Sequence, residues 1–161
     1  MFVIDYRGYG KSTGSFDEEQ MYNDALLSYN YVKSKFNEEQ IVVYGRSLGT
    51  TFASKVGAEN KPKHIILEAP FFSLHNAANY KYKIVPKFLL SFKFRTNDLV
   101  QKISSPTTIF HGTNDRVTPY KGSKELFKLL TVKSKELVLL NDGTHHNVRD
   151  FKAYTKALKS I

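Results

Sequence analysis

The sequence Gly-Arg-Ser-Leu-Gly at residues 45–49 places Ser47 between two glycines at the spacing of a nucleophile elbow. In an elbow the serine stands on a sharp turn between a strand and a helix, where larger side chains at the glycines would collide with nearby backbone. The flanks fit, because residues 41–44 are β-branched and aromatic and residues 50–56 suit a helix. We therefore expect a nucleophilic serine, with the Leu48 backbone N–H facing a developing oxyanion. The alternative is a serine that only caps a helix.

An acid and two histidines follow two later strand-like segments. Asp115 lies in the loop after residues 107–111, and His145 and His146 lie in the loop after residues 136–140. Loops that follow parallel strands open at the same edge of a sheet, so these side chains can converge on the serine. The order Ser, Asp, His is that of the α/β-hydrolase triad and differs from the orders in chymotrypsin and subtilisin. We predict such a triad, against the alternative of a capping serine, a turn aspartate and surface histidines.

Strand and helix patterns alternate along the chain. The segments predicted as strands are residues 2–6, 41–44, 64–68, 107–111 and 136–140. Those predicted as helices begin near residue 15 and end near residue 36, and then span residues 50–56, 120–130 and 148–160. This alternation predicts an α/β fold with a mostly parallel sheet and helices on both faces. The 161 residues suit one domain, residues 1–161, with its own core.

The first predicted helix has signals for its start and for its buried face. Ser15 and Glu18 have the spacing of a capping box. Its apolar stripe, which should face the sheet, consists of Tyr22, Ala25, Tyr29, Val32 and Phe36.

Residues 71–105 break the regular alternation. Aromatic and basic residues are interleaved there, as in Tyr80-Lys81-Tyr82-Lys83, and Phe88, Phe92 and Phe94 follow. Such interleaving can serve nucleic-acid or membrane binding. We favour a lid-like excursion over the active site, because insertions after strand ends lie over the ligand crevice of an open sheet. Its aromatic residues would then shape an apolar substrate pocket.

Composition excludes several classes of protein. Cysteine is absent, so there is no thiolate metal site, and we expect neither a metal nor an organic cofactor. The net charge of +9 comes from scattered lysines rather than one basic run, so we expect no nucleic-acid partner, while a membrane surface stays open. No signal peptide and no apolar run of about 18 residues is visible, which makes a cytoplasmic location the default expectation.

Other residues that could suggest a site have simpler explanations. The glycine-rich turn at residues 7–14 lacks the spacing of a phosphate-binding loop or a dinucleotide fingerprint. Asp5 and Arg7 are expected to be structural. The same holds for His64 at the start of a strand, and His75 is expected on the surface rather than as a ligand.

Taken together, the motifs resemble the α/β-hydrolase superfamily, and in particular its esterase-like and acyl-thioesterase-like serine hydrolases. They are Asp-Tyr-Arg-Gly-Tyr-Gly-Lys-Ser-Thr-Gly at 5–14, the Gly-Arg-Ser-Leu-Gly elbow, His-Gly-Thr-Asn-Asp at 111–115 and Gly-Thr-His-His-Asn at 143–147. The resemblance implies that Ser47 is the nucleophile and Asp115 the triad acid. It favours His146 as the base, because His146 directly precedes Asn147. His145 is the alternative, which the Gly-Thr-His spacing supports.

The resemblance also implies strands that precede the first motif. On that basis the chain starts at the fourth strand of the fold, residues 2–6 lack their neighbours, and the elbow strand is an exposed edge. The loop that supplies a second oxyanion donor would be missing as well. We therefore expect a hydrolase of an ester or thioester, acting on a small-molecule or acylated substrate. The alternative is a catalytically impaired fragment, scaffold or binding module with the same fold.

Overall fold

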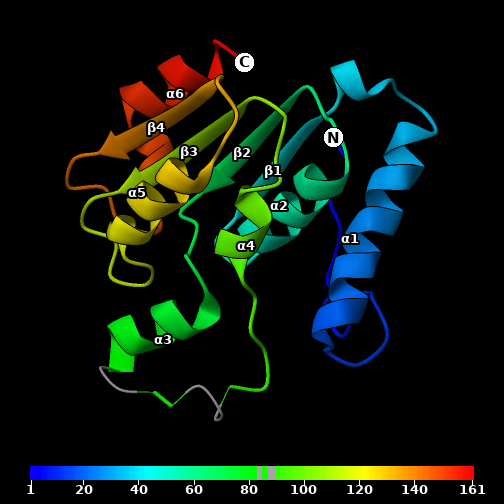
Figure 1. The fold of residues 1–161 in the computed structure, drawn as a ribbon, viewed down its shortest axis with the longest axis horizontal. Coiled ribbons are helices and arrows are strands. Elements are labelled where there is room, and N and C mark those ends of the chain that lie inside the picture. The colour runs from blue at the N-terminus through cyan, green and yellow to red at the C-terminus, as the bar shows by residue number, and fades with distance from the viewer. Residues whose placement is uncertain (83–84, 87–89) are drawn as a thin grey trace.

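The sheet of the protein has four parallel strands in the order in which they occur along the chain (Figure 1). The computed structural model describes residues 1–82, 85–86 and 90–161. The strands are β1 Val42–Arg46, β2 His64–Glu68, β3 Thr107–Gly112 and β4 Lys135–Leu140. The predicted α/β class with a parallel sheet is confirmed.

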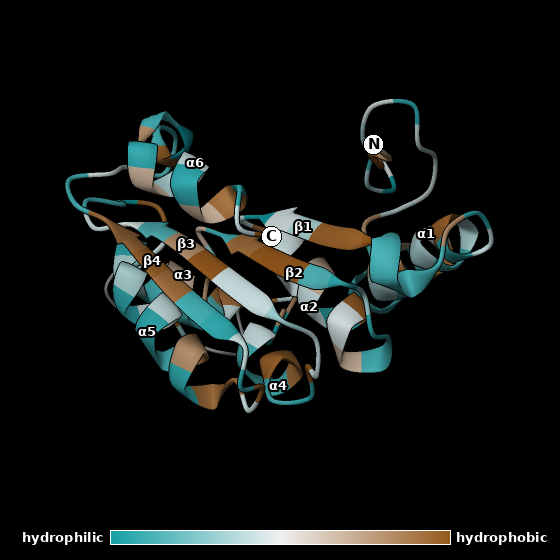
Figure 2. Ribbon diagram, turned by 90° about the horizontal axis from the view of Figure 1, so that it is seen from above, coloured by the Kyte–Doolittle hydropathy of each residue, from teal (hydrophilic) through white to brown (hydrophobic). Residues whose placement is uncertain are grey.

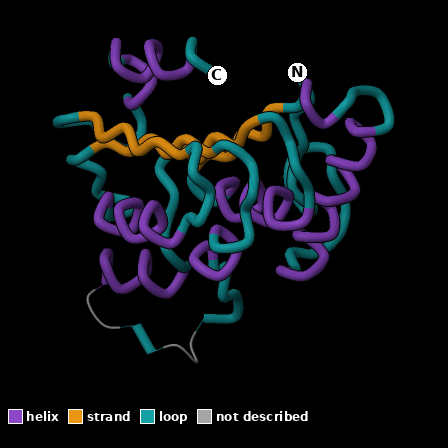
Figure 3. Tube along the Cα trace, turned by 45° about the horizontal axis from the view of Figure 1, so that its top comes forward, coloured by secondary structure: helices purple, strands orange, loops and turns teal. Residues whose placement is uncertain are grey.

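Helices cover both faces of the sheet, but unequally. They are α1 Glu18–Lys33, α2 Gly49–Glu59, α3 Leu74–Tyr82, α4 Thr96–Val100, α5 Tyr120–Leu129 and α6 Lys152–Leu158, with 3-10 turns at Glu38–Gln40 and Val148–Asp150. Figure 3 shows α6 on one side of the sheet and the other helices on the opposite side. The strands β2 and β3 are therefore covered on both faces, which explains why nearly all of their residues are buried.

The start of α1 differs in detail from the prediction. Asp17, not Ser15, is the N-cap, and its side chain accepts the N–H of Gln20 at 2.8 Å. Ala25 and Tyr29 of the predicted stripe are buried, whereas Phe36 lies beyond the end of the helix and is exposed.

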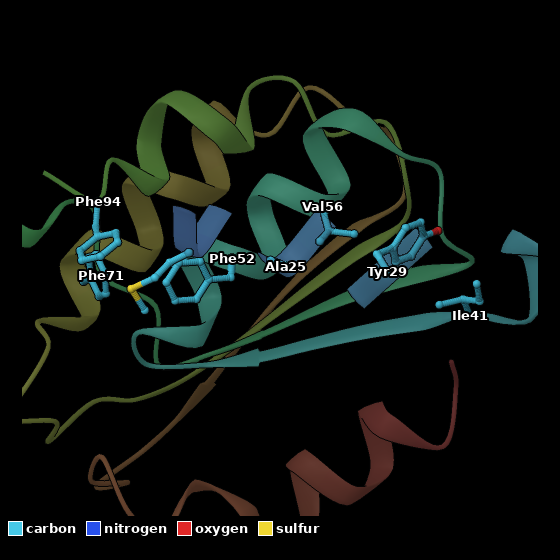
Figure 4. Close-up of a cluster of buried hydrophobic side chains, with 8 residues drawn as sticks. Ala25, Tyr29, Ile41, Phe52, Val56, Phe71 and Phe94 are labelled. Atoms are coloured by element: carbon cyan, nitrogen blue, oxygen red, sulfur yellow. The ribbon is translucent and has the colours of Figure 1, made fainter. Parts of the chain in front are cut away.

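The hydrophobic core lies in three clusters on the two faces of the sheet. Figure 4 shows the first, where side chains of α1 and α2 meet Phe71 and Phe94 from the segment after β2. A second cluster lies between the sheet and the helices α2, α4 and α5. The third lies under α6 and includes Phe110 and Tyr154, whose ring centroids are 4.3 Å apart. Figure 2 shows hydrophobic stretches in the strands of the sheet and many hydrophilic residues on the surrounding helices.

Residues 2–6 do not form the strand that their composition predicts. No strand among the described residues lies beside them, so their backbone has no ladder of hydrogen bonds to join. Tyr6 nevertheless reaches the core, with its ring centroid 5.0 Å from that of Phe52. As expected, β1 is an edge of the sheet, and Val42 and Tyr44 are partly exposed there.

The segment after β2 is partly core. Phe94 is buried and packs on Phe52, Phe92 is half-buried, and Tyr80 and Tyr82 are exposed. Phe88 lies outside the described residues, as does Lys83. Among the described residues, no helix has the length and apolar character needed to cross a membrane.

Candidate active site

The chain turns sharply at Ser47, between β1 and α2. Ser47 has φ of +51°, a left-handed conformation that is unusual for a residue other than glycine. A Cβ at Gly45 would lie only 2.3 Å from the carbonyl oxygen of Gly49, so the turn closes only with glycine at that position. Strained backbone of this kind recurs at functional sites, and here it sets the serine apart from an ordinary helix cap.

Leu48 is the N-cap residue of α2 and follows the serine directly. Within the described part of the chain, its backbone N–H has no hydrogen-bond partner outside the helix. The Leu48 N–H is therefore available to donate a hydrogen bond to an oxyanion.

Asp115 lies in the loop after β3 and is 2% exposed. Its Oδ1 accepts the backbone N–H groups of Val117 and Thr118, each at 2.8 Å. Its Oδ2 accepts the Thr118 hydroxyl at 3.1 Å and lies 2.7 Å from Nδ1 of His145. Burial alone would raise the pKa of Asp115, but the hydrogen bonds from His111, His145 and the two backbone groups hold it well below its usual range. Asp115 is thus a buried carboxylate that remains charged.

The contact that we expected of His146 is made by His145 instead. His145 is buried, and its Nδ1 faces Asp115, whereas His146 is exposed and its Nδ1 lies 3.4 Å from Nη2 of Arg46. A carboxylate can only accept, so Nδ1 of His145 carries the proton and Nε2 has the lone pair when the ring is neutral. The two successive histidine side chains have different partners, so only His145 contacts Asp115.

His111 is a buried polar residue at the site that the sequence analysis missed. Its Nε2 lies 3.2 Å from Oδ2 of Asp115, and its Nδ1 lies 2.6 Å from the hydroxyl of Ser123 in α5. It is fully buried. A histidine four residues before the acid, at the end of an apolar strand, was the available signal.

The remaining predicted residues have structural contacts. Arg7 forms a bidentate pair with Asp24 of α1 at 2.7 and 2.8 Å, and Asp5 accepts the N–H of Lys11. Nε2 of His64 lies 2.9 Å from the Thr108 hydroxyl. These contacts agree with the structural roles expected of them.

Two further observations concern ligands. His75, expected on the surface, is half-buried, and its Nε2 lies 2.9 Å from the carbonyl oxygen of Val85. The described residues contain no cluster of His, Asp or Glu side chains arranged to hold a metal ion.

Helix α3 approaches the site from the segment predicted as a lid. The hydroxyl of Tyr80 donates to the backbone carbonyl of Asp115 at 3.3 Å. Figure 1 shows α3 apart from the main body of helices, at the end of the molecule toward which β3 and β4 run. A role for residues 71–105 as a lid stays a prediction.

Comparison with known proteins gives the family. The model of the family described as serine aminopeptidase, S33, matches residues 1–97 and 84–151. The chain belongs to this family of α/β hydrolases. It is 31% identical to human protein ABHD12B over 90% of this chain and 47% of that protein. It is also 31% identical to the lysophosphatidylserine lipase ABHD12 of Danio rerio, over 84% of this chain and 40% of that protein.

Solved structures support the same α/β-hydrolase fold. An esterase of Pyrococcus furiosus, Pf2001, superposes with a TM-score of 0.77 at 20% identity, over 97% of this chain and 67% of that structure. The S33-family chain described here spans about half the length of the curated relatives it matches. Among these proteins, the Danio rerio relative is named a lipase and the Pyrococcus furiosus protein an esterase.

Proposed function

We propose that this chain is a serine hydrolase that cleaves a carboxylic ester or thioester through an acyl-enzyme on Ser47. The observation that carries the proposal is the 2.7 Å contact between Nδ1 of His145 and the buried Oδ2 of Asp115. That contact fixes the tautomer in which Nε2 can take a proton. The strained backbone of Ser47 between its two glycines supplies the matching nucleophile position.

In the proposed first step, Nε2 of His145 takes the Ser47 proton as Oγ bonds to the acyl carbon. The negative charge that develops on the carbonyl oxygen is met by the Leu48 N–H. Asp115 stabilises the imidazolium without itself taking the proton. The bond to the leaving oxygen or sulfur then breaks, and His145 returns the proton to the departing alcohol or thiol.

In the second step, water acts as the nucleophile in place of Ser47. His145 takes a proton from the water as its oxygen bonds to the acyl carbon. The bond to Oγ of Ser47 then breaks, His145 returns the proton to Oγ, and the carboxylic acid leaves. The cycle restores every group of the protein and needs no cofactor.

The test is labelling by a fluorophosphonate probe, which reacts with activated serines. We expect labelling of the 161-residue chain, with loss on Ser47→Ala and a large fall on His145→Ala. The matched control is His146→Ala, one residue away and exposed, which should label at nearly the wild-type rate. Equal loss in the two histidine variants, or labelling that survives Ser47→Ala, would contradict the assignment.

The substrate class would then be determined by measuring the turnover of a panel of candidate substrates. Short-chain nitrophenyl esters, acyl thioesters and monoacyl phospholipids cover the two bond types and the chemistry named for the ABHD12 relatives. A peptide amide belongs in the panel because of the family's description. We expect turnover of esters or thioesters; cleavage of the amide alone would contradict the proposal.

One observation favours the alternative of a non-catalytic module with this fold. Among the described residues, the Ser47 hydroxyl makes no hydrogen bond to the ring of His145 or His146. A folded chain that neither labels nor turns over any ester or thioester would favour that alternative.

A further inference from the structure

A buried carboxylate lies beside the proposed site without taking part in the steps above. Glu68, the last residue of β2, is 1% exposed. Its Oε2 accepts the Tyr44 hydroxyl at 2.7 Å, the Tyr154 hydroxyl at 2.9 Å and Nε of Arg149 at 3.0 Å. Its Oε1 lies 3.0 Å from Nε of Arg46 in an ion pair that lacks hydrogen-bond alignment. A carboxylate this far from water persists only because partners of this kind surround it.

Both arginines connect Glu68 to the loop that carries the histidines. Nη2 of Arg46 donates to the backbone carbonyl of His145 at 2.7 Å. Arg149 lies four residues after His145. It also donates to the Tyr44 hydroxyl, and its guanidinium lies over the Tyr44 ring. Its hydrogen bond to Glu68 raises the pKa of the Arg149 guanidinium further. The histidine loop is therefore held at His145 and, just beyond its C-terminal end, at Arg149.

Glu68 also contacts the nucleophile turn through its main chain. The backbone N–H of Ser47 donates to the Glu68 carbonyl at 2.9 Å. Arg46 is the last residue of β1 and directly precedes Ser47, so a displacement of its side chain is transmitted to the serine turn. One residue of β2 thus contacts the serine turn through its backbone and is linked to the histidine loop through Arg46.

We propose that Glu68 is a positioning residue that sets the spacing between Ser47 and His145, and that it acts through its ion pairs with Arg46 and Arg149. This inference rests on the proposed function for its effect on rate, but the geometry it predicts can be measured without activity. Positioning matters because displacement of a catalytic group by about 1 Å can cost on the order of a hundredfold in rate.

A purely structural ion pair offers the matched control. Arg7 and Asp24 form a bidentate pair that ties the N-terminal segment to α1, and in the described part of the chain neither side chain is bonded to a residue of the site. Asp24→Asn weakens that pair as Glu68→Gln weakens the other, with the same chemical change. Because the Asp24 side chain is 39% exposed and Glu68 is buried, the free energy of unfolding of each variant is measured as well. A change at the site in Glu68→Gln protein that remains folded, without one in Asp24→Asn, then reflects the site.

The first measurement is the low-field proton NMR signal of the His145 Nδ1 proton, assigned by its loss in His145→Ala. We expect Glu68→Gln and Arg46→Met to shift or broaden this signal and Asp24→Asn to leave it in place. Variants that fold, by circular dichroism, yet keep the wild-type signal would overturn the inference. This readout is available whether or not the protein labels.

The second measurement is the rate of labelling by the fluorophosphonate probe. We expect Glu68→Gln and Arg46→Met to label about tenfold to a hundredfold more slowly than Asp24→Asn. Arg46→Lys should recover part of the rate, because a lysine keeps the charge but cannot reach the carboxylate and the carbonyl together. Rates within twofold of wild type would overturn the positioning role, whereas absence of labelling in wild type would count against the proposed function alone.

Discussion

Two regions of the molecule differ greatly in how far their side chains are buried. One is the pair of loops after β3 and β4, and the other is the flank, which consists of residues 2–6 and the edge strand β1. In these loops and at the end of β3, the side chains of Asp115, His145 and His111 are all buried and contact one another or neighbouring backbone. On the flank, Val3 is 76% exposed and Val42 of β1 is 41% exposed. Apolar side chains that face water on an edge strand contribute little to folding and leave a surface open to pairing.

This difference separates two requirements of the site. The proposed acid and base, Asp115 and His145, are held by contacts among the chain's own residues, so their geometry does not depend on what covers β1. The serine stands at the end of β1 and depends on the elbow glycines, on β2 and on Arg46. The experiments below perturb the two regions in turn.

The largest effect is expected at the acid. Asp115→Asn replaces the carboxylate that faces His145 by a neutral amide, so Nδ1 of His145 loses its negatively charged acceptor. We expect probe labelling and any ester turnover to fall by about 10⁴. The measurement is the labelling rate beside wild type at equal concentration; a fall of less than tenfold would remove Asp115 from the triad.

The next effect concerns stability where the two loops meet. A Cβ at Gly112 would lie 2.2 Å from the carbonyl oxygen of Gly143, in contact with backbone that cannot rotate away. We expect Gly112→Ala to reduce the free energy of unfolding by about 3 kcal/mol, measured by urea denaturation.

The control for this change is a glycine with room around it. At Gly122 in α5 the nearest heavy atom to an added Cβ is 3.4 Å away. Gly122→Ala should be neutral or stabilise the protein by up to about 1 kcal/mol, because alanine favours a helix. Equal losses at the two glycines would show that the loops do not meet so closely.

A third effect is expected in the pH dependence of stability. The pKa of Asp115 is lower in the folded protein than in the unfolded chain, so the unfolded chain binds its proton first as pH falls. The stabilisation is present above a pH of about 4 and declines below it by at most about 1.4 kcal/mol per pH unit. Urea denaturation between pH 5 and 3 should give a shallower decline for Asp115→Asn; identical slopes would contradict the depressed pKa.

The smallest effect is expected on the flank. Val3→Thr replaces an exposed apolar side chain by a polar one of similar shape, so the free energy of unfolding should change by less than about 0.5 kcal/mol. Labelling should be unchanged. A loss above about 1 kcal/mol at high protein concentration that disappears on dilution would show that another molecule covers this flank.

Much of this architecture was predictable because the signals were local. The strands of the sheet, the long helices and the turn at Ser47 follow from short-range periodicity and from glycine spacing. Residues 2–6 were predicted as a strand and are not one, because a strand also needs a neighbour, which composition does not report.

The site was predictable only in outline. Asp115 follows its strand as expected, but the choice between His145 and His146 depends on which way each side chain points in an irregular loop. The roles of His111 and Glu68 depend on contacts between distant segments. Nothing in the spacing of single residues reveals which buried polar groups share a carboxylate.

The backbone contact between the β3 loop and the histidine loop also bears on motion. The N–H of Asn114 donates to the carbonyl of Gly143 at 2.8 Å, and that of Thr113 donates to Leu140 at 2.9 Å. Segments joined main chain to main chain have no flexible side chain between them to absorb displacement, so the acid and the base should fluctuate together as one body. The Ser47 N–H is bonded main chain to main chain as well, to the Glu68 carbonyl, so the motion left at the site is chiefly that of the side chains. Arg46, which directly precedes Ser47 and donates to the His145 carbonyl, restrains that motion.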